Sequence, residues 1–154
     1  MTEQVKMMEE IRIKKEVKIQ APIKLIKDTI LDTANYPSFL DSFRKSYVHE
    51  SEENYSDVLF HAKVLMFPIQ FRIHTQLEGD SVIRFHQISG YFEKLEGTWT
   101  LEDKGQSTLI KFDASFKMPP RAIQTLIKAC RDHFFPELIE FFQSEIQKRI
   151  KASA

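Results

Sequence analysis

Histidine is the residue whose spacing in this sequence comes nearest to a metal or catalytic site. Three of the five histidines, His61, His74 and His86, fall in three successive predicted strands, and three imidazoles are sufficient to bind zinc. Each of them directly follows an apolar residue of its strand, so strand alternation places it on the outer, solvated face. No carboxylate is spaced to accept the second N–H of these rings. We therefore expect no metal site.

The other reactive side chains form no recognisable catalytic motif. The single cysteine, Cys130, lies on the apolar face of a predicted helix, where a small core residue is commoner than a nucleophile. The sequence contains no Ser-His-Asp order, no glycine-rich phosphate loop and no histidine-glutamate zinc motif. It therefore identifies no catalytic residue, and no cofactor is expected.

Composition indicates a soluble globular protein with a large apolar interior. The 154 residues suit one domain, and the 22 basic and 22 acidic residues cancel, which gives no electrostatic argument for nucleic acid. No apolar run suggests a signal peptide or a membrane span, and one cysteine excludes an internal disulfide, so a cytoplasmic location is expected. The 13 phenylalanines, against one tryptophan, predict either a dry core or a lined cavity.

Alternation of apolar and polar residues predicts strands over most of the chain. After residues 1–9, expected to be a flexible tail, a strand covers about residues 11–19 and ends at Ala21-Pro22. Two short helical segments follow, over about 22–31 and 33–40. Runs with a two-residue period then continue from Phe43 to Met118, separated by polar turns.

The remainder, residues 121–151, is predicted to be one long amphipathic helix. One apolar arc contains Ile123, Leu126, Ile127, Cys130, Phe134, Leu138 and Phe141, and an adjacent arc contains Phe135, Ile139, Phe142, Ile146 and Ile150. Pro136 should kink the helix or split it near Phe134. Strands followed by a helix indicate an α+β class. We predict a helix-grip fold over residues 10–151, with a curved antiparallel sheet of six or seven strands wrapped around the C-terminal helix.

One helix is too narrow to cover such a sheet completely, so the fold predicts an internal space for a ligand. A solid core is the alternative. The predicted ligand contacts are the inward apolar residues of both layers: Phe60, Ala62, Val64, Phe71, Ile73, Phe85, Trp99, Phe112, Phe116, Ile127, Phe134, Leu138 and Phe141. Entry is expected near Met66-Phe67-Pro68, or between the helix and the Tyr36–Leu40 segment. Ala62 is the small residue in a row of larger ones, which would leave room for a ligand.

Three segments carry a resemblance to a known superfamily. They are VKIQAP at residues 17–22, DTANYPSFL at 32–40, and GYFEKLEGTWTL at 90–101 with Thr108 opening the next strand. In order and spacing the chain resembles the START-like, or Bet v 1-like, superfamily, in particular its polyketide cyclase/dehydrase and coenzyme Q-binding types. The resemblance implies the helix-grip fold, and for the coenzyme Q-binding type it implies ubiquinone-like isoprenoid ligands.

Three functions remain open at this point. The first is a carrier or chaperone for an apolar small molecule such as a lipid, an isoprenoid quinone or a polyketide. The second is a cyclase/dehydrase-type enzyme, for which Arg72, Arg84 and Asp113 would support enolate chemistry, although strand alternation places all three outward. The third is a module that binds a protein or ribosomal partner. The apolar inward positions favour the first, because an enzyme needs a polar pair inside, and Tyr47, Tyr55 and Gln87 are the few candidates for one.

Overall fold

The computed structural model describes residues 9–153, so the predicted tail at 1–9 lies outside the described part apart from Glu9. The strands are β1 (Ile11–Ile19), β2 (Phe43–Ser51), β3 (Tyr55–Val64), β4 (Phe67–Glu78), β5 (Val82–Gly90), β6 (Lys94–Asp103) and β7 (Thr108–Lys117). The helices are α2 (Ile23–Leu31), η1 (Thr33–Asn35), α3 (Tyr36–Phe39), α4 (Gln124–Ala129), η2 (Cys130–Phe134) and α5 (Phe135–Ser153).

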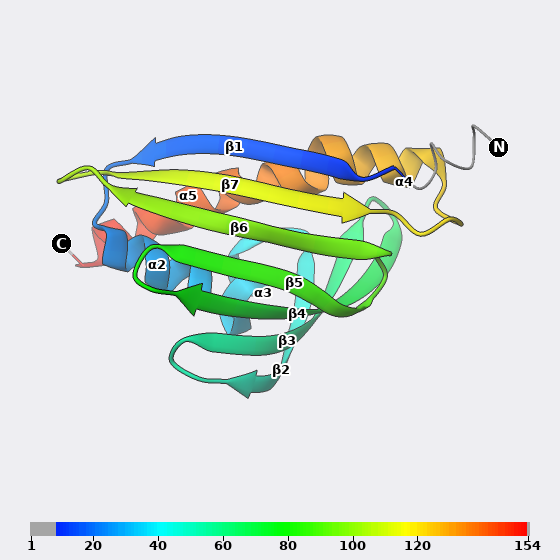
Figure 1. The fold of residues 1–154 in the computed structure, drawn as a ribbon, viewed down its shortest axis with the longest axis horizontal. Coiled ribbons are helices and arrows are strands. Elements are labelled where there is room, and N and C mark those ends of the chain that lie inside the picture. The colour runs from blue at the N-terminus through cyan, green and yellow to red at the C-terminus, as the bar shows by residue number, and fades with distance from the viewer. Residues whose placement is uncertain (1–8, 154) are drawn as a thin grey trace.

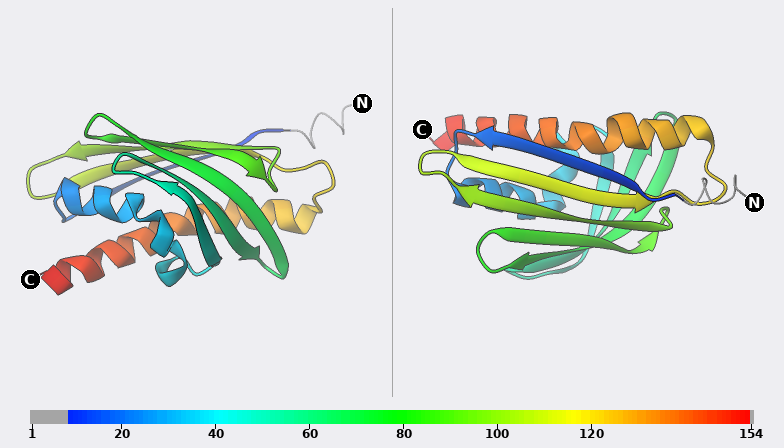
Figure 2. Two further views of the ribbon diagram at one scale, coloured as in Figure 1. Left: turned by 90° about the horizontal axis from the view of Figure 1, so that it is seen from below. Right: turned by 45° about the horizontal axis from the view of Figure 1, so that its top comes forward.

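The strands form one antiparallel sheet of seven, in the order β1-β7-β6-β5-β4-β3-β2 (Figure 1). The first strand pairs with the last, β7, so the two ends of the strand sequence lie side by side. The sheet is curved, and α4, η2 and α5 lie across its hollow face together with α2 and α3 (Figure 2). The predicted helix-grip fold is confirmed, including the short helices after the first strand.

Strand alternation decides which side chains reach the space under the helix. Along β4, Ile69, Phe71, Ile73 and Thr75 are buried, whereas the residues between them are exposed or half-buried. The inward run of β3 ends at Val64, the last residue of the strand. Leu65 has a φ of 56° and forms a turn with Met66, which is 79% exposed at the tip of the hairpin.

The C-terminal helix is interrupted at the place that Pro136 predicts. Residues Cys130–Phe134 form a π-helical turn, and α5 begins at Phe135, one residue before the proline. Proline has no N–H to donate into the preceding turn, and a wider turn accommodates its ring. The five-residue step from Cys130 to Phe135 shifts the buried stripe of the second half to Phe135, Ile139, Phe142 and Ile146.

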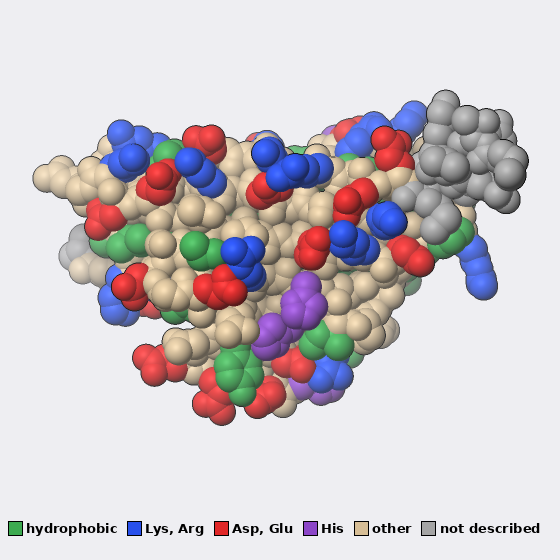
Figure 3. Space-filling model, in the orientation of Figure 1, with side chains coloured by type: hydrophobic (Ala, Val, Ile, Leu, Met, Phe, Trp, Pro, Cys, Tyr) green, Lys and Arg blue, Asp and Glu red, His purple; other side chains and the backbone are tan. Residues whose placement is uncertain are grey.

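The outer face of the sheet is polar, with acidic and basic side chains interspersed (Figure 3). His74 of β4 is opposite His86 of β5, and their ring centroids lie 5.4 Å apart. Within residues 9–153 no group of His, Cys, Asp and Glu side chains is arranged to hold a metal ion. No helix of the described chain is long and apolar enough to cross a membrane.

Arg72 differs from the expectation of a merely solvated charge. Its guanidinium donates two hydrogen bonds to the Asp57 carboxylate, at 2.7 and 2.6 Å, and the Asp57 side chain is only 12% exposed. The two residues lie on neighbouring strands, β4 and β3, with a diagonal offset. These hydrogen bonds and the positive charge of Arg72 hold the pKa of Asp57 below its usual value, although burial acts in the opposite direction.

Candidate ligand-binding cavity

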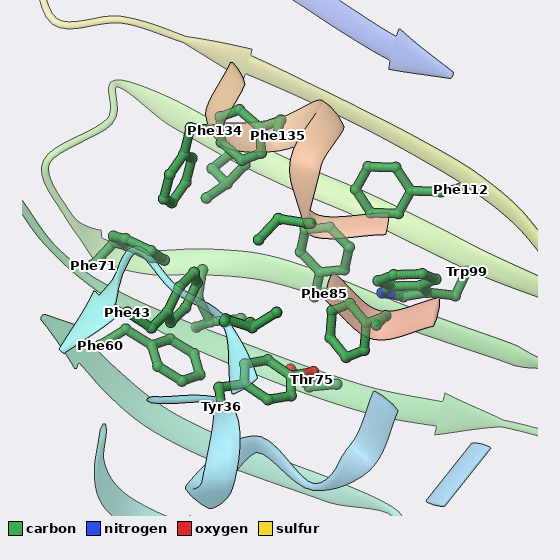
Figure 4. A pocket seen from close by; sticks show the side chains of 15 residues that line it. Tyr36, Phe43, Phe60, Phe71, Thr75, Phe85, Trp99, Phe112, Phe134 and Phe135 are labelled. Carbon is green, nitrogen blue, oxygen red and sulfur yellow. The ribbon is translucent and has the colours of Figure 1, made fainter. Parts of the chain in front are cut away.

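An apolar cavity lies between the hollow face of the sheet and the C-terminal helix (Figure 4). It is lined by Tyr36, Leu40, Phe43, Phe60, Phe71, Ile73, Thr75, Phe85, Leu95, Trp99, Phe112, Phe134, Phe135, Leu138 and Phe142. The space that the centres of water molecules could occupy is about 60 Å³. That is enough for a few waters, but its lining offers them few hydrogen-bonding partners.

The sheet supplies one wall through the inward positions of β3 to β7. Phe60 and Phe71 face each other across β3 and β4, with ring centroids 5.8 Å apart. Phe85 lies over Gly97, its partner on β6, and stacks on Phe112 at 6.1 Å. Because Gly97 has no side chain, the Phe85 ring lies close to the sheet, and the space above it stays open.

The helix supplies the opposite wall, and the π-turn decides which residues form it. Phe134 stacks on Phe43 of β2 at 5.9 Å, and Phe142 meets the Trp99 ring at 5.0 Å. Phe134 is the last residue of the π-turn and Phe135 the first of α5, so adjacent residues both reach the cavity. In a regular α-helix, by contrast, two consecutive side chains point in directions about 100° apart.

The short helix α3 closes one end with Tyr36 and its neighbours. The Tyr36 ring stacks on Phe60 at 5.4 Å and meets Phe142 edge-on at 5.3 Å. Its hydroxyl donates a hydrogen bond to the backbone oxygen of Ile30. Burial of this hydroxyl, and secondarily the negative charge of Asp32, raise the pKa of Tyr36 well above its usual value. Tyr36 therefore remains neutral and holds its proton at physiological pH.

Two further polar groups belong to the lining, the Thr75 hydroxyl and the Trp99 indole N–H. Both residues are 5% exposed. Tyr36 is the only ionisable residue of the lining, and the other members are Phe, Leu and Ile. The cavity therefore has an electrically neutral wall with a small number of hydrogen-bonding groups, the composition usual for a small-molecule site.

Comparison with known proteins places this architecture in a family. The model of the polyketide cyclase / dehydrase and lipid transport family matches residues 19–143. The chain belongs to this family. No curated protein sequence shows significant similarity to the chain.

Several solved structures share the fold of this family member at low sequence identity. The aromatase/cyclase Zhui of Streptomyces sp. R1128 has a TM-score of 0.82 at 16% identity, over 95% of this chain and 99% of that one. A START superfamily protein of Mycobacterium smegmatis has a TM-score of 0.76 at 14% identity, over 89% and 97% of the two chains. TTHA0849 of Thermus thermophilus has a TM-score of 0.77 at 18% identity, over 95% and 99%. These neighbours share the fold of this chain.

In this family member, most of the predicted contact residues line the cavity. They are Phe60, Phe71, Ile73, Phe85, Trp99, Phe112, Phe134 and Leu138. Their contact with a ligand stays a prediction. Sheet alternation identified which strand residues face inward, because a strand's two faces are fixed once one is buried, but not which of them reach the cavity.

The other predicted contacts, Ala62, Val64, Phe116, Ile127 and Phe141, do not line the cavity. Phe116 is buried against Phe135, with ring centroids 4.5 Å apart, and Ala62 is buried opposite Phe43 on β2. Val64 and Phe141 line a groove outside the cavity, and Ile127 lines another. The residues of α4 precede the π-turn and those of α5 follow it, so the regular helical arc drawn through Ile127 and Phe141 does not follow the buried face.

Sequence reasoning missed Tyr36, Leu40, Phe43, Thr75, Leu95, Phe135 and Phe142. Thr75 lies on the same strand face as Ile73, and Leu95 on the same face as Trp99, so alternation alone identifies their face. Phe135 and Phe142 belong to the adjacent helical arc, and Pro136 indicated that the helix is interrupted there but not which arc faces the cavity. Tyr36 lies in the DTANYPSFL segment, but no pattern in the sequence shows that its ring reaches the cavity.

The side chains considered for catalysis lie elsewhere. Tyr47 is exposed, Tyr55 donates a hydrogen bond to Glu50 on the outer surface, and the Gln87 amide is engaged by the backbone of Phe92. Cys130 is buried in the core, and burial raises the pKa of its thiol to about 12, which keeps it protonated and unreactive.

A groove on the surface adjoins the cavity at the π-turn. It has a volume of about 360 Å³ and is lined in part by Val64 and Leu65 of the β3–β4 hairpin and by Phe141. Leu40, Phe134 and Leu138 line both the groove and the cavity. These three side chains therefore form the partition between the cavity and the surface, next to the Tyr36–Leu40 segment where entry is predicted.

Proposed function

We propose that this protein encloses a neutral, apolar small molecule in the cavity and acts as its carrier or chaperone. The observation that carries the proposal is the lining itself: aromatic and aliphatic side chains from sheet and helix surround a space that they leave unfilled. A protein core normally packs without such voids, because each lost contact forfeits dispersion energy. Membership of the cyclase/dehydrase and lipid transport family supports the same function.

The proposed ligand contains rings or branched apolar chains. The walls present flat aromatic faces, such as Phe60, Phe85 and Phe134, against which a ring packs with offset or edge-on geometry. The shared fold of Zhui, an aromatase/cyclase, supports a ligand of this kind. The space open to water centres, about 60 Å³, is less than half of the roughly 150 Å³ of an engineered cavity that takes up benzene. Binding of a fused-ring molecule therefore requires the lining rings to move apart.

A carrier is better supported than a cyclase/dehydrase enzyme. Proton transfer at a carbon next to a carbonyl needs a side chain that exchanges a proton near neutral pH. The ionisable residue of the lining, Tyr36, keeps its proton and donates a hydrogen bond to the Ile30 carbonyl. Arg72, Arg84 and Asp113 are engaged on the outer face, by Asp57, Glu78 and Arg12 respectively.

Native mass spectrometry of freshly purified protein, followed by titration with the neutral fluorophore N-phenyl-1-naphthylamine, tests the proposal. We expect either a co-purifying apolar molecule or saturable uptake of the fluorophore. The Ile73→Phe variant should lose uptake, because its added ring projects into the cavity, whereas Ile88→Phe on the exposed outer face should retain it. Wild-type protein that carries no ligand and takes up no fluorophore would overturn the proposal.

A further inference from the structure

Two polar groups in the cavity wall lack a hydrogen-bond partner within the described chain. Thr75 and Trp99 are each 5% exposed, and both line the cavity. Among residues 9–153, neither the Thr75 hydroxyl nor the Trp99 N–H bonds to another protein group, and neither atom is sealed off from the cavity space. A group that is open to the cavity can hydrogen-bond to a water molecule or a ligand there, and buried polar groups in native structures normally have such a partner.

The third polar group of the wall behaves differently, which makes the contrast informative. The Tyr36 hydroxyl is also enclosed, but it bonds to the Ile30 carbonyl. Thr75 and Trp99 both extend from the sheet toward the interior (Figure 4). Their hydrogen-bonding capacity is therefore available to whatever occupies the cavity.

We propose that Thr75 and Trp99 are polar anchors for carbonyl oxygens of the ligand, an inference that rests on the proposed function. The indole N–H is a donor only, and the threonine hydroxyl donates or accepts, so the chemistry that satisfies both is an acceptor oxygen. Tyr36 is the only ionisable residue of the lining, so a carboxylate would be buried there without a counter-charge at a large cost. A ketone or quinone oxygen fits both conditions.

The register of the sheet shows how such a ligand lies. Thr75 of β4 is opposite Phe85 of β5, and Phe85 is opposite Gly97 of β6. Trp99 is two residues beyond Gly97, opposite Ile83. The two anchors are thus on either side of Phe85, separated across the sheet by two strand spacings, or roughly 10 Å. A ring system that packs on Phe85 directs oxygens at its edges toward one anchor or the other.

A matched pair of ligands tests the two polar anchors separately from binding in the cavity. Tetralin and 1-tetralone share one bicyclic skeleton, and only the second has a carbonyl. Calorimetric titration gives the ratio of their affinities for the wild type and for the Thr75→Val, Trp99→Phe and Thr100→Val variants. Thr100, on the same strand as Trp99 but outside the lining, provides the control. We expect the preference for 1-tetralone to fall about tenfold in Thr75→Val or in Trp99→Phe, by loss of one hydrogen bond.

The outcomes distinguish the two proposals. In Thr75→Val and in Trp99→Phe the affinity for tetralin should stay within about twofold of the wild type, and Thr100→Val should behave as the wild type. If both cavity variants bound tetralin and kept the wild-type preference for the ketone, the proposed role of Thr75 and Trp99 would be wrong, whereas the proposed binding function would stand. No binding of either compound by the wild type would overturn the proposed function itself. Urea unfolding of each variant identifies one that does not fold, and the other cavity variant then decides.

Discussion

Gly97 keeps the cavity open by leaving room for the Phe85 ring, and Gly97→Ala tests this directly. A methyl group at Gly97 would overlap Cζ of Phe85, would lie 2.7 Å from its Cε1, and would lie 3.0 Å from the backbone oxygen of Asp113. The backbone of β7 is fixed by its pairing with β6, so the Phe85 ring is the group that moves. It has the cavity beside it, and we expect it to rotate into that space.

Two opposing contributions decide whether Gly97→Ala stabilises or destabilises the protein. Replacing a strand glycine with alanine gains about 0.5–1 kcal/mol, because alanine loses less backbone entropy on folding. Forcing an extra methyl against a packed ring costs about 1–3 kcal/mol. The overlap with Phe85 is severe, so the cost prevails, and we expect a net loss of about 1–2 kcal/mol. The displaced ring also occupies much of the roughly 60 Å³ that the cavity offers.

Urea unfolding and N-phenyl-1-naphthylamine titration measure the two effects in Gly97→Ala, Phe85→Leu and the double variant. We expect Gly97→Ala to weaken uptake about tenfold or more, since the ligand must then expel a phenyl ring. Leucine at position 85 is shorter, so the double variant should recover part of both losses, with a coupling of at least about 1 kcal/mol. If Gly97→Ala bound the fluorophore like the wild type, and Phe85→Leu gave no recovery, the account of Gly97 would be wrong.

Two further predictions concern the outer ion pair and the partition. Asp57→Asn should cost about 1–2 kcal/mol at pH 7, because Arg72 loses a charged partner. The pKa of Asp57 is lowered on folding, so the stability it supplies is complete above its unfolded pKa of about 4 and is lost as pH falls toward the folded value. Unfolding curves across that range should show a cost that shrinks with acidity, and a constant cost would contradict the assignment. Leu138→Ala, which thins the partition, should speed fluorophore association severalfold in stopped-flow measurements, at a stability cost of about 2 kcal/mol. Leu77→Ala, on a strand outside the lining, should leave the rate unchanged, and equal acceleration in both would refute the partition.

The sheet side of the cavity was readable from sequence because a strand has a two-residue period and only two faces. Once Phe71 and Ile73 are assigned inward, Thr75 follows on the same face without further information. The pairing of Asp57 with Arg72 was not readable, because it depends on the register between two strands. No local pattern states which residues of neighbouring strands become diagonal neighbours.

The helix side was only partly readable, and the reason is geometric. Pro136 indicated that the C-terminal helix is interrupted but not in what way. A kink, a break and a π-turn would each bury a different face of the helix. The observed π-turn adds one residue between Cys130 and Phe135, which brings Phe135 and Phe142 inward and leaves Phe141 in the surface groove. Whether Tyr36 and Leu40 line the cavity depends on how α3 packs against the sheet and the C-terminal helix, which is a tertiary property.

The helix is held firmly at one end, and this constrains where the cavity opens. Near the C-terminus Arg149 donates hydrogen bonds to Asp32, after α2, at 2.7 Å and to Glu145 at 2.9 Å. Each of these side chains is less than a third exposed, so solvent weakens the network less than it weakens a surface pair. At the other end, the π-turn lies beside the groove, and its Asp132 and His133 contact Arg131 and Glu137 on the same helix.

A ligand that contains fused rings enters this space of about 60 Å³ only if part of the wall moves. Moving α5 near its C-terminus breaks charged hydrogen bonds, each worth about 1.5–3 kcal/mol. Moving Phe134 and Leu138 at the π-turn separates apolar side chains that a bound ligand then covers again, so most of that cost is returned. The energetic difference favours expansion at the π-turn, where the cavity and the surface groove already share their lining.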